Sequence, residues 1–202
     1  KVNKTFFNFL ILPIIFGLAG WSFVIFLISD WFSHFIIILM AVLLYMLINQ
    51  FYLYFNVPNK YQPYSLETLS LYMSLLASFF LYVAAFGAVV LLQFNKLGLI
   101  MGLSVIMIFL LYQFFWLSKF DLKKNWMFVL VITMLLGQLF WAITFLPTGY
   151  YVNGFAIVLA LYLMLGFSKH YLLDNLNRKR ILSYLFVGAA CLLIVFATAQ
   201  WT

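Results

Sequence analysis

The chain contains very little charge. Only 7% of its 202 residues are charged, and only four are acidic, whereas about 25% of the residues of a soluble globular domain carry charge. The single cysteine, Cys191, lies inside an apolar run and has no second cysteine with which to form an intrachain disulfide. These shortages exclude both an ordinary soluble domain and a small disulfide-stabilised one.

Ionisable side chains are also missing from the middle of every long apolar run. Asp30, His34 and Lys96 stand near one set of run ends, and the remaining charged residues stand near the opposite ends. Because a charge is costly inside a bilayer, an intramembrane charge usually marks an ion pathway or a proton relay. Its absence argues against a proton- or sodium-coupled transporter and against an intramembrane hydrolase.

Motifs for catalysis and metal binding are missing as well. The sequence has no glycine-rich phosphate loop, no CxxC pair and no HExxH. We expect His34 and His170 on opposite membrane faces, each with a single acid four residues away, and zinc sites need three or four ligands. We therefore predict a protein that is not an enzyme, with no catalytic residue, no metal site and no cofactor. An enzyme acting on lipids through the segment 168–174 ranks last among the alternatives.

Hydrophobic residues make up the rest of the chain. They account for 68% of the sequence, and the mean hydropathy is +1.15, which indicates a multi-pass membrane protein. A bilayer core about 30 Å thick needs roughly 20 apolar residues per helix, and backbone groups in lipid must be hydrogen-bonded within the segment. We predict an all-α fold, a single integral membrane domain over 1–202. Its seven transmembrane helices are expected at about 7–29, 32–55, 67–93, 97–118, 125–146, 154–173 and 181–200.

Basic residues divide unevenly between the two sets of helix ends. Lys96 is at one set, and the other ten are at the opposite set. Cytoplasmic loops concentrate Lys and Arg, so the division predicts a cytoplasmic N-terminus and, with seven spans, a C-terminus on the opposite side. Topology thus explains the net charge of +7 without a nucleic-acid partner. The ten are Lys1, Lys4, Lys60, Lys119, Lys123, Lys124, Lys169, Arg178, Lys179 and Arg180.

A possible repeat organises the predicted spans. In three places a glycine is followed 25 residues later by a tyrosine: Gly20 and Tyr45, Gly87 and Tyr112, and Gly137 and Tyr162. The pattern predicts three antiparallel helical hairpins followed by one C-terminal helix. Such a repeat can flank a central site, or it can reflect duplication of a packing unit.

The turn of the third predicted hairpin carries no charge. We expect it over 146–155, where Pro147, Gly149, Asn153 and Gly154 favour a turn. The linker 56–65, with Pro58 and Pro63, is the longest connection between hairpins. It is therefore the best candidate for a hinge or a partner-binding loop.

Polar residues inside the spans are the candidate packing or substrate groups. Ser70, Ser74 and Ser78 recur every four residues and predict a helix-packing face. Gln138 is the deepest amide, and an amide in lipid most often hydrogen-bonds to a neighbouring helix. A substrate contact is the alternative role for all four.

The basic residues beside the later spans are the candidate interaction surface. They suit anionic lipid or an acidic partner, although topology alone also accounts for them. They are Lys119, Lys123, Lys124, Lys169, Arg178, Lys179 and Arg180.

Two classes of function follow from this sequence. The first is a non-catalytic scaffold or subunit of a membrane complex. The alternative is a small transporter or lipid-handling protein for a neutral or lipidic substrate, with a cavity between the hairpins near Gln138 and the serine face. Membrane lipids and other membrane-protein subunits are the expected partners, and nucleic acid is not.

Overall fold

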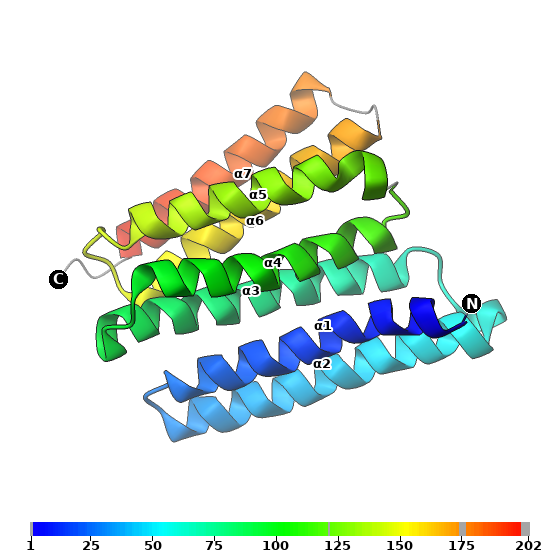
Figure 1. Ribbon diagram of the computed structural model, residues 1–202, viewed down its shortest axis with the longest axis horizontal. Coiled ribbons are helices and arrows are strands. Elements are labelled where there is room, and N and C mark those ends of the chain that lie inside the picture. The colour runs from blue at the N-terminus through cyan, green and yellow to red at the C-terminus, as the bar shows by residue number, and fades with distance from the viewer. Residues whose placement is uncertain (1, 121, 174–176, 199–202) are drawn as a thin grey trace.

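The computed structural model describes residues 2–120, 122–173 and 177–198. These residues form seven α-helices and one short 3₁₀ helix, η1 (Figure 1). The elements are α1 Val2–Ile25, α2 Asp30–Asn56, η1 Pro58–Lys60, α3 Ser65–Leu92, α4 Lys96–Leu117, α5 Leu122–Ile143, α6 Tyr150–Leu172 and α7 Arg178–Thr198. The prediction of an all-α fold is confirmed.

Six of the helices, α1 to α6, are long and apolar enough to cross a bilayer. In α7 the apolar stretch that the structure describes is shorter, Ile181–Leu193. The protein is therefore an integral, multi-pass membrane protein with six candidate spans and a shorter apolar C-terminal helix.

Two predicted boundaries were wrong. The first span was expected to reach residue 29, but α1 ends at Ile25, and tight backbone hydrogen bonds from Phe26 and Leu27 close the turn. The third hairpin turn is shorter than 146–155, because α6 already begins at Tyr150. Asn153 and Gly154 lie inside α6 and are buried. These two residue types, which favour turns, are used here in the first turns of the helix and in its packing.

The helices run alternately in opposite directions, so the molecule has two ends (Figure 1). We call the end that carries the α2–α3, α4–α5 and α6–α7 connections the basic end, because Lys60, Lys119, Lys169 and Arg178 lie there. We call the other end, with the short connections 26–29, 93–95 and 144–149, the turn end. Of the basic side chains that the structure describes, only Lys96 is at the turn end, where its ammonium lies 4.8 Å from the centroid of the Phe145 ring.

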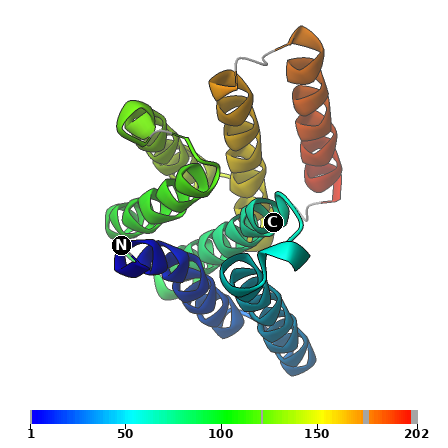
Figure 2. The same ribbon diagram turned by 90° about the vertical axis from the view of Figure 1, so that its right-hand side faces the viewer.

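Helix α3 is the centre of the bundle, and its most extensive contacts are with α6 and α1 (Figure 2). Small buried residues such as Ala77, Ser78 and Gly87 let its neighbours approach. Helix α6 approaches the backbone of α3 at Gly154: a Cβ there would lie 2.5 Å from Cγ2 of Val83 and 3.0 Å from its backbone nitrogen. The core therefore depends on a glycine at this crossing.

The predicted hairpins are present as antiparallel neighbours, but they are not the main packing units. The most extensive contacts join α3 to α6 and α1, which belong to other hairpins. The three repeat glycines also meet different elements, since Gly20 faces Met40, Gly87 faces Phe26 and Gly137 faces Ile100. Helix α7 packs on α6 at the edge of the bundle (Figure 2).

Candidate functional site

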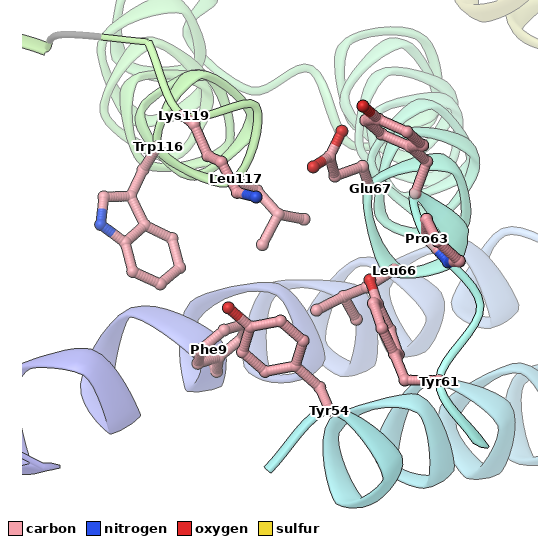
Figure 3. A pocket seen from close by; sticks show the side chains of 10 residues that line it. Phe9, Tyr54, Tyr61, Pro63, Leu66, Glu67, Trp116, Leu117 and Lys119 are labelled. Atoms are coloured by element: carbon pink, nitrogen blue, oxygen red, sulfur yellow. The ribbon is translucent and has the colours of Figure 1, made fainter. Parts of the chain in front are cut away.

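A cavity between helices lies at the basic end, where α1, α2, α3 and α4 converge (Figure 3). Its volume is about 570 Å³, within the range of about 300–1,000 Å³ that is usual for ligand sites. We call it the basic-end pocket. Its lining residues are Phe9, Tyr54, Tyr61, Pro63, Tyr64, Leu66, Glu67, Trp116, Leu117 and Lys119.

Two opposite charges face each other across this pocket. The carboxylate of Glu67, from the first turn of α3, and the ammonium of Lys119, just beyond α4, both point into the space between the two helices (Figure 3). A carboxylate is favoured at a helix N-terminus and a cation at a helix C-terminus. Each charge therefore has a local stabilising partner in its own helix. Glu67 is half-buried and Lys119 is exposed, and neither side chain makes an ion pair or a side-chain hydrogen bond within the part of the chain that the structure describes.

Aromatic rings form one wall of the basic-end pocket. Phe9, which is 5% exposed, lies with its ring centroid 5.0 Å from that of Trp116 and 6.1 Å from that of Tyr54. Tyr54 in turn meets Tyr61 edge-on at 5.2 Å. Such edge-to-face contacts stabilise the aromatic cluster. The wall therefore joins α1, α2, α4 and the linker.

The backbone at the pocket adopts an unusual conformation. Tyr64 and Lys119 have φ angles of 65° and 60°, in the left-handed region that glycine normally occupies. At Lys119 this conformation completes a helix-ending motif in which the amides of Lys119 and Phe120 bond to the carbonyls of Trp116 and Phe115. Strained residues of this kind tend to cluster at ligand sites. Among non-glycine residues described here, the only other with positive φ is Gln93.

Two buried polar groups lie one helical turn deeper than the pocket lining. Ser70 follows Leu66 by four residues on α3, and Gln113 precedes Leu117 by four residues on α4. Gln113 is 2% exposed and Ser70 4% exposed. Neither amide atom of Gln113, nor the Ser70 hydroxyl, has a hydrogen-bond partner among the described residues.

The predicted serine face of α3 is buried along its whole length. The hydroxyl of Ser78 donates to the carbonyl of Ser74 at 2.8 Å and lies 3.7 Å from the sulfur of Met107 on α4. That contact places Ser78 opposite Met107, and in this antiparallel register Gln113 lies at a depth between Ser70 and Ser74. The serines therefore lie at the interface between helices, and the basic-end pocket opens one turn beyond Ser70.

Gln138 lies elsewhere, on the exposed side of α5. It lines an open groove of about 320 Å³ between α4 and α5, together with Ser104, Thr133 and Gly137. Ser70, Ser74 and Ser78 do not line this groove. The structure therefore does not bring Gln138 and the serine face together in one cavity.

The predicted basic surface is divided among three connections at the basic end. Lys119 follows α4, Lys169 is in the last turn of α6, and Arg178 and Lys179 begin α7. Of these residues, only Lys119 lines the basic-end pocket. Lys123, Lys124 and Arg180 lie in helices, but their side chains are outside the described part of the chain.

The histidines remain far apart, with His34 near the turn end of α2 and His170 near the basic end of α6. His170 Nε2 lies 3.3 Å from the hydroxyl of Tyr184 on α7. A search of the described residues finds no group of three or more His, Cys, Asp or Glu side chains that could hold a metal ion.

The basic-end pocket was not predicted from the sequence. Glu67 and Lys119 are more than 50 positions apart, and only the packing of α3 against α4 makes them neighbours. One prediction did concern this region, since the linker 56–65 is the sequence's candidate for a hinge or a partner-binding loop. Tyr61, Pro63 and Tyr64 of that linker line the pocket.

Comparison with known families places the chain in a group defined by sequence alone. Residues 1–198 match the family described as Protein of unknown function (DUF5656), and the chain belongs to this family. No curated protein and no solved structure gives a significant match.

Proposed function

We propose that this multi-pass membrane protein of the DUF5656 family is a non-catalytic lipid-handling protein that holds a phospholipid headgroup in its basic-end pocket. The observation that carries the proposal is a cavity lined by Glu67 and Lys119, two opposite charges that form no ion pair in the described part of the chain. Both residues lie at the ends of candidate spans. Helix ends of this kind reach the polar headgroup layer, which adds about 5–8 Å to each side of the hydrocarbon core.

The lining of the pocket suits an amphiphilic ligand. Phe9, Leu66 and Leu117 are buried apolar residues at its inner side. Glu67, Lys119 and the tyrosines supply the polar groups. A lipid presents the same gradient, from a charged headgroup to apolar chains. The shared polarity supports a lipid over a wholly polar solute.

A phospholipid with a photoreactive headgroup tests this proposal. After irradiation in a reconstituted membrane, mass spectrometry should find cross-links concentrated in residues 54–67 and 116–119. The groove beside Gln138 is the internal control, because it is exposed to lipid and lies on α5. Cross-links spread evenly over the helices, or concentrated at Gln138, would contradict a headgroup site at the basic end.

We further propose that the basic end is cytoplasmic, since it holds most of the Lys and Arg residues. Single cysteines introduced at Asn59 and Tyr150, in a background in which Cys191 is replaced, should react with an impermeant thiol reagent from opposite sides of the membrane. Labelling of both positions from one side would contradict the arrangement of the six candidate spans.

A role as scaffold or subunit of a complex is the second candidate, and α2 favours it. This helix of 27 residues buries only Met40 and Leu47. Val42, Tyr45 and Met46 are all about half exposed or more. A photoreactive residue at Val42 should cross-link to another protein if α2 is an interface, and only to lipid if it faces the bilayer.

A further inference from the structure

We infer that the ligand of the basic-end pocket is a zwitterionic phospholipid headgroup, whose phosphate is bound by Lys119 and whose ammonium is bound by Glu67 and the aromatic wall. The inference rests on the proposed lipid-handling function and specifies its ligand. The charges of Glu67 and Lys119 face each other in Figure 3 and make no ion pair with each other.

A ligand of a single charge would leave one of these residues without a partner. An anionic headgroup would satisfy Lys119 but would place its negative charge beside the carboxylate of Glu67. A cation would satisfy Glu67 and be repelled by Lys119. A phosphate joined to an ammonium by a short linker satisfies both at once, and charges of the wrong sign exclude competing ligands.

The aromatic wall adds a second surface for the ammonium. The rings of Tyr54, Tyr61 and Trp116 line the same cavity as Glu67. The face of an aromatic ring attracts a cation, and the attraction is stronger where water is displaced. An ammonium between Glu67 and these rings would therefore be bound by two kinds of contact, whereas a phosphate gains nothing from the ring faces.

The backbone at Lys119 is the independent observation. A glycine would complete the end of α4 without the left-handed penalty, yet a lysine occupies the position with a φ of 60°. Tyr64 has the same conformation on the facing side of the pocket. Two of the three non-glycine residues with positive φ in the described part of the chain thus line one cavity, which supports a role for their side chains there.

A divalent cation fits less well. Glu67 is the one carboxylate in the pocket lining, and calcium or magnesium requires several oxygen ligands. The lysine on the opposite side would also repel a metal ion. The charge pattern thus favours an organic zwitterion.

Two variants of the full-length protein separate the roles of the charges. Glu67→Gln removes the carboxylate charge with little change of shape. Lys119→Gly removes the ammonium and relieves the left-handed strain, so it should not unfold the chain. Lys60→Gln is the matched control, because Lys60 is an exposed lysine at the same end and does not line the pocket. Thermal unfolding of each variant in detergent verifies the fold.

Binding is measured by calorimetry with three probes: dihexanoyl phosphatidylethanolamine, dihexanoyl phosphatidylglycerol and chain-free glycerophosphoethanolamine. We expect the wild-type protein to prefer the ethanolamine lipid over the other two. Glu67→Gln should lower the affinity for the ethanolamine lipid by about tenfold, the cost of one charge-assisted hydrogen bond. It should not lower the affinity for phosphatidylglycerol. Lys119→Gly should lower the affinity for both lipids by about tenfold, and Lys60→Gln should change neither affinity.

The outcomes distinguish this inference from the proposed function. Suppose that Glu67→Gln binds the ethanolamine lipid as tightly as the wild-type protein does, while Lys119→Gly binds both lipids less tightly. The pocket then binds lipid, but the zwitterion assignment is wrong. If neither variant has a lower affinity for either lipid, both the inference and the proposed headgroup site are wrong. Equal affinity for glycerophosphoethanolamine would identify a soluble zwitterion as the ligand and overturn the lipid-handling function.

Discussion

The two ends of the molecule are closed in different ways. At the turn end the hydroxyls of Tyr150 and Tyr151 donate to the carbonyl of Phe26, at 3.4 and 3.3 Å, and join α6 to the end of α1. The ring of Phe23 stacks on that of Phe80 with a centroid separation of 4.7 Å. At the basic end, Glu67 and Lys119 face each other across a cavity without forming an ion pair. Both ends are joined by direct contacts between helices, but only the basic end combines them with two opposite charges that line a cavity.

Cavities are present at both ends, but their chemistry differs. Near the turn end, a cavity of about 390 Å³ lies between α1 and α2 and is lined mainly by apolar side chains such as Phe23, Leu27 and Ile36. The basic-end pocket combines apolar residues with two charges and three tyrosines. Apolar grooves on a membrane protein are filled by lipid chains without specificity, whereas paired charges select a headgroup. This difference is why we propose the ligand site at the basic end.

The largest expected effect comes from adding a methyl group where α6 crosses α3 near the turn end. Gly154→Ala would place a methyl group 2.5 Å from Val83 Cγ2 and 3.0 Å from its backbone nitrogen. Because backbone cannot yield as a flexible side chain does, we expect a loss of about 2–3 kcal/mol in the free energy of unfolding. Denaturation in mild detergent measures it.

Gly98→Ala is the matched control for this prediction. Gly98 is a helical residue at the same end, and a Cβ there has no heavy atom within 4 Å. Alanine in an open helical position should stabilise by about 0.5–1 kcal/mol. Equal effects of the two substitutions would mean that α3 and α6 are not in close contact at Gly154.

The next effect concerns the buried polar groups beneath the basic-end pocket. Gln113→Leu replaces an amide without partners by an apolar side chain of similar size, and we expect a gain of about 1–2 kcal/mol in the free energy of unfolding. Gln138→Leu is the control, because Gln138 is exposed and its replacement should change stability less. A loss of stability in Gln113→Leu would show that the amide is hydrogen-bonded in the membrane.

The tyrosine contacts at the turn end should give a smaller effect. The double substitution Tyr150→Phe and Tyr151→Phe removes both hydroxyl donors to Phe26 and keeps the rings. Both bonds are long and partly exposed, so we expect a loss of about 1 kcal/mol in total, measured by denaturation. Lipid binding at the basic end should not change. A change in headgroup affinity would contradict the independence of the two ends.

The smallest effect is expected at Lys119 itself. Lys119→Gly relieves a left-handed φ of 60°, which should stabilise the fold by about 1 kcal/mol. It also removes a cation from the C-terminus of α4, which should destabilise the fold by about 0.3–1 kcal/mol. The free energy of unfolding should therefore change by less than about 1 kcal/mol in either direction. A large loss of stability would show that Lys119 has a structural partner. The left-handed φ of Lys119 would then no longer support a role in ligand binding.

Much of the fold follows from the order of apolar and polar residues. Apolar runs of sufficient length predict helices in lipid, and seven helices are found within a few residues of the predicted ranges. The exceptions were local, as at Gly154, which was assigned to a turn but lies inside α6. Glycine serves both turns and close helix contacts, and sequence does not distinguish the two uses.

The candidate site was much less predictable. The serine face was predicted as a packing surface, and all three serines are buried on α3. Gln138 was expected beside them, but it lines a separate groove. Helical periodicity places residues on a face of their own helix, and it carries no information about which helix covers that face.

Sequence alone determined that this is a helical, multi-pass membrane protein with its basic residues gathered at one set of helix ends, because hydropathy and charge act residue by residue along the chain. Tertiary structure decided that α3 is central, that α7 is peripheral, and that Glu67 and Lys119 share a pocket. Those outcomes depend on which helix faces fit together, and in a bilayer that fit comes from small residues such as Gly154 rather than from hydrophobicity.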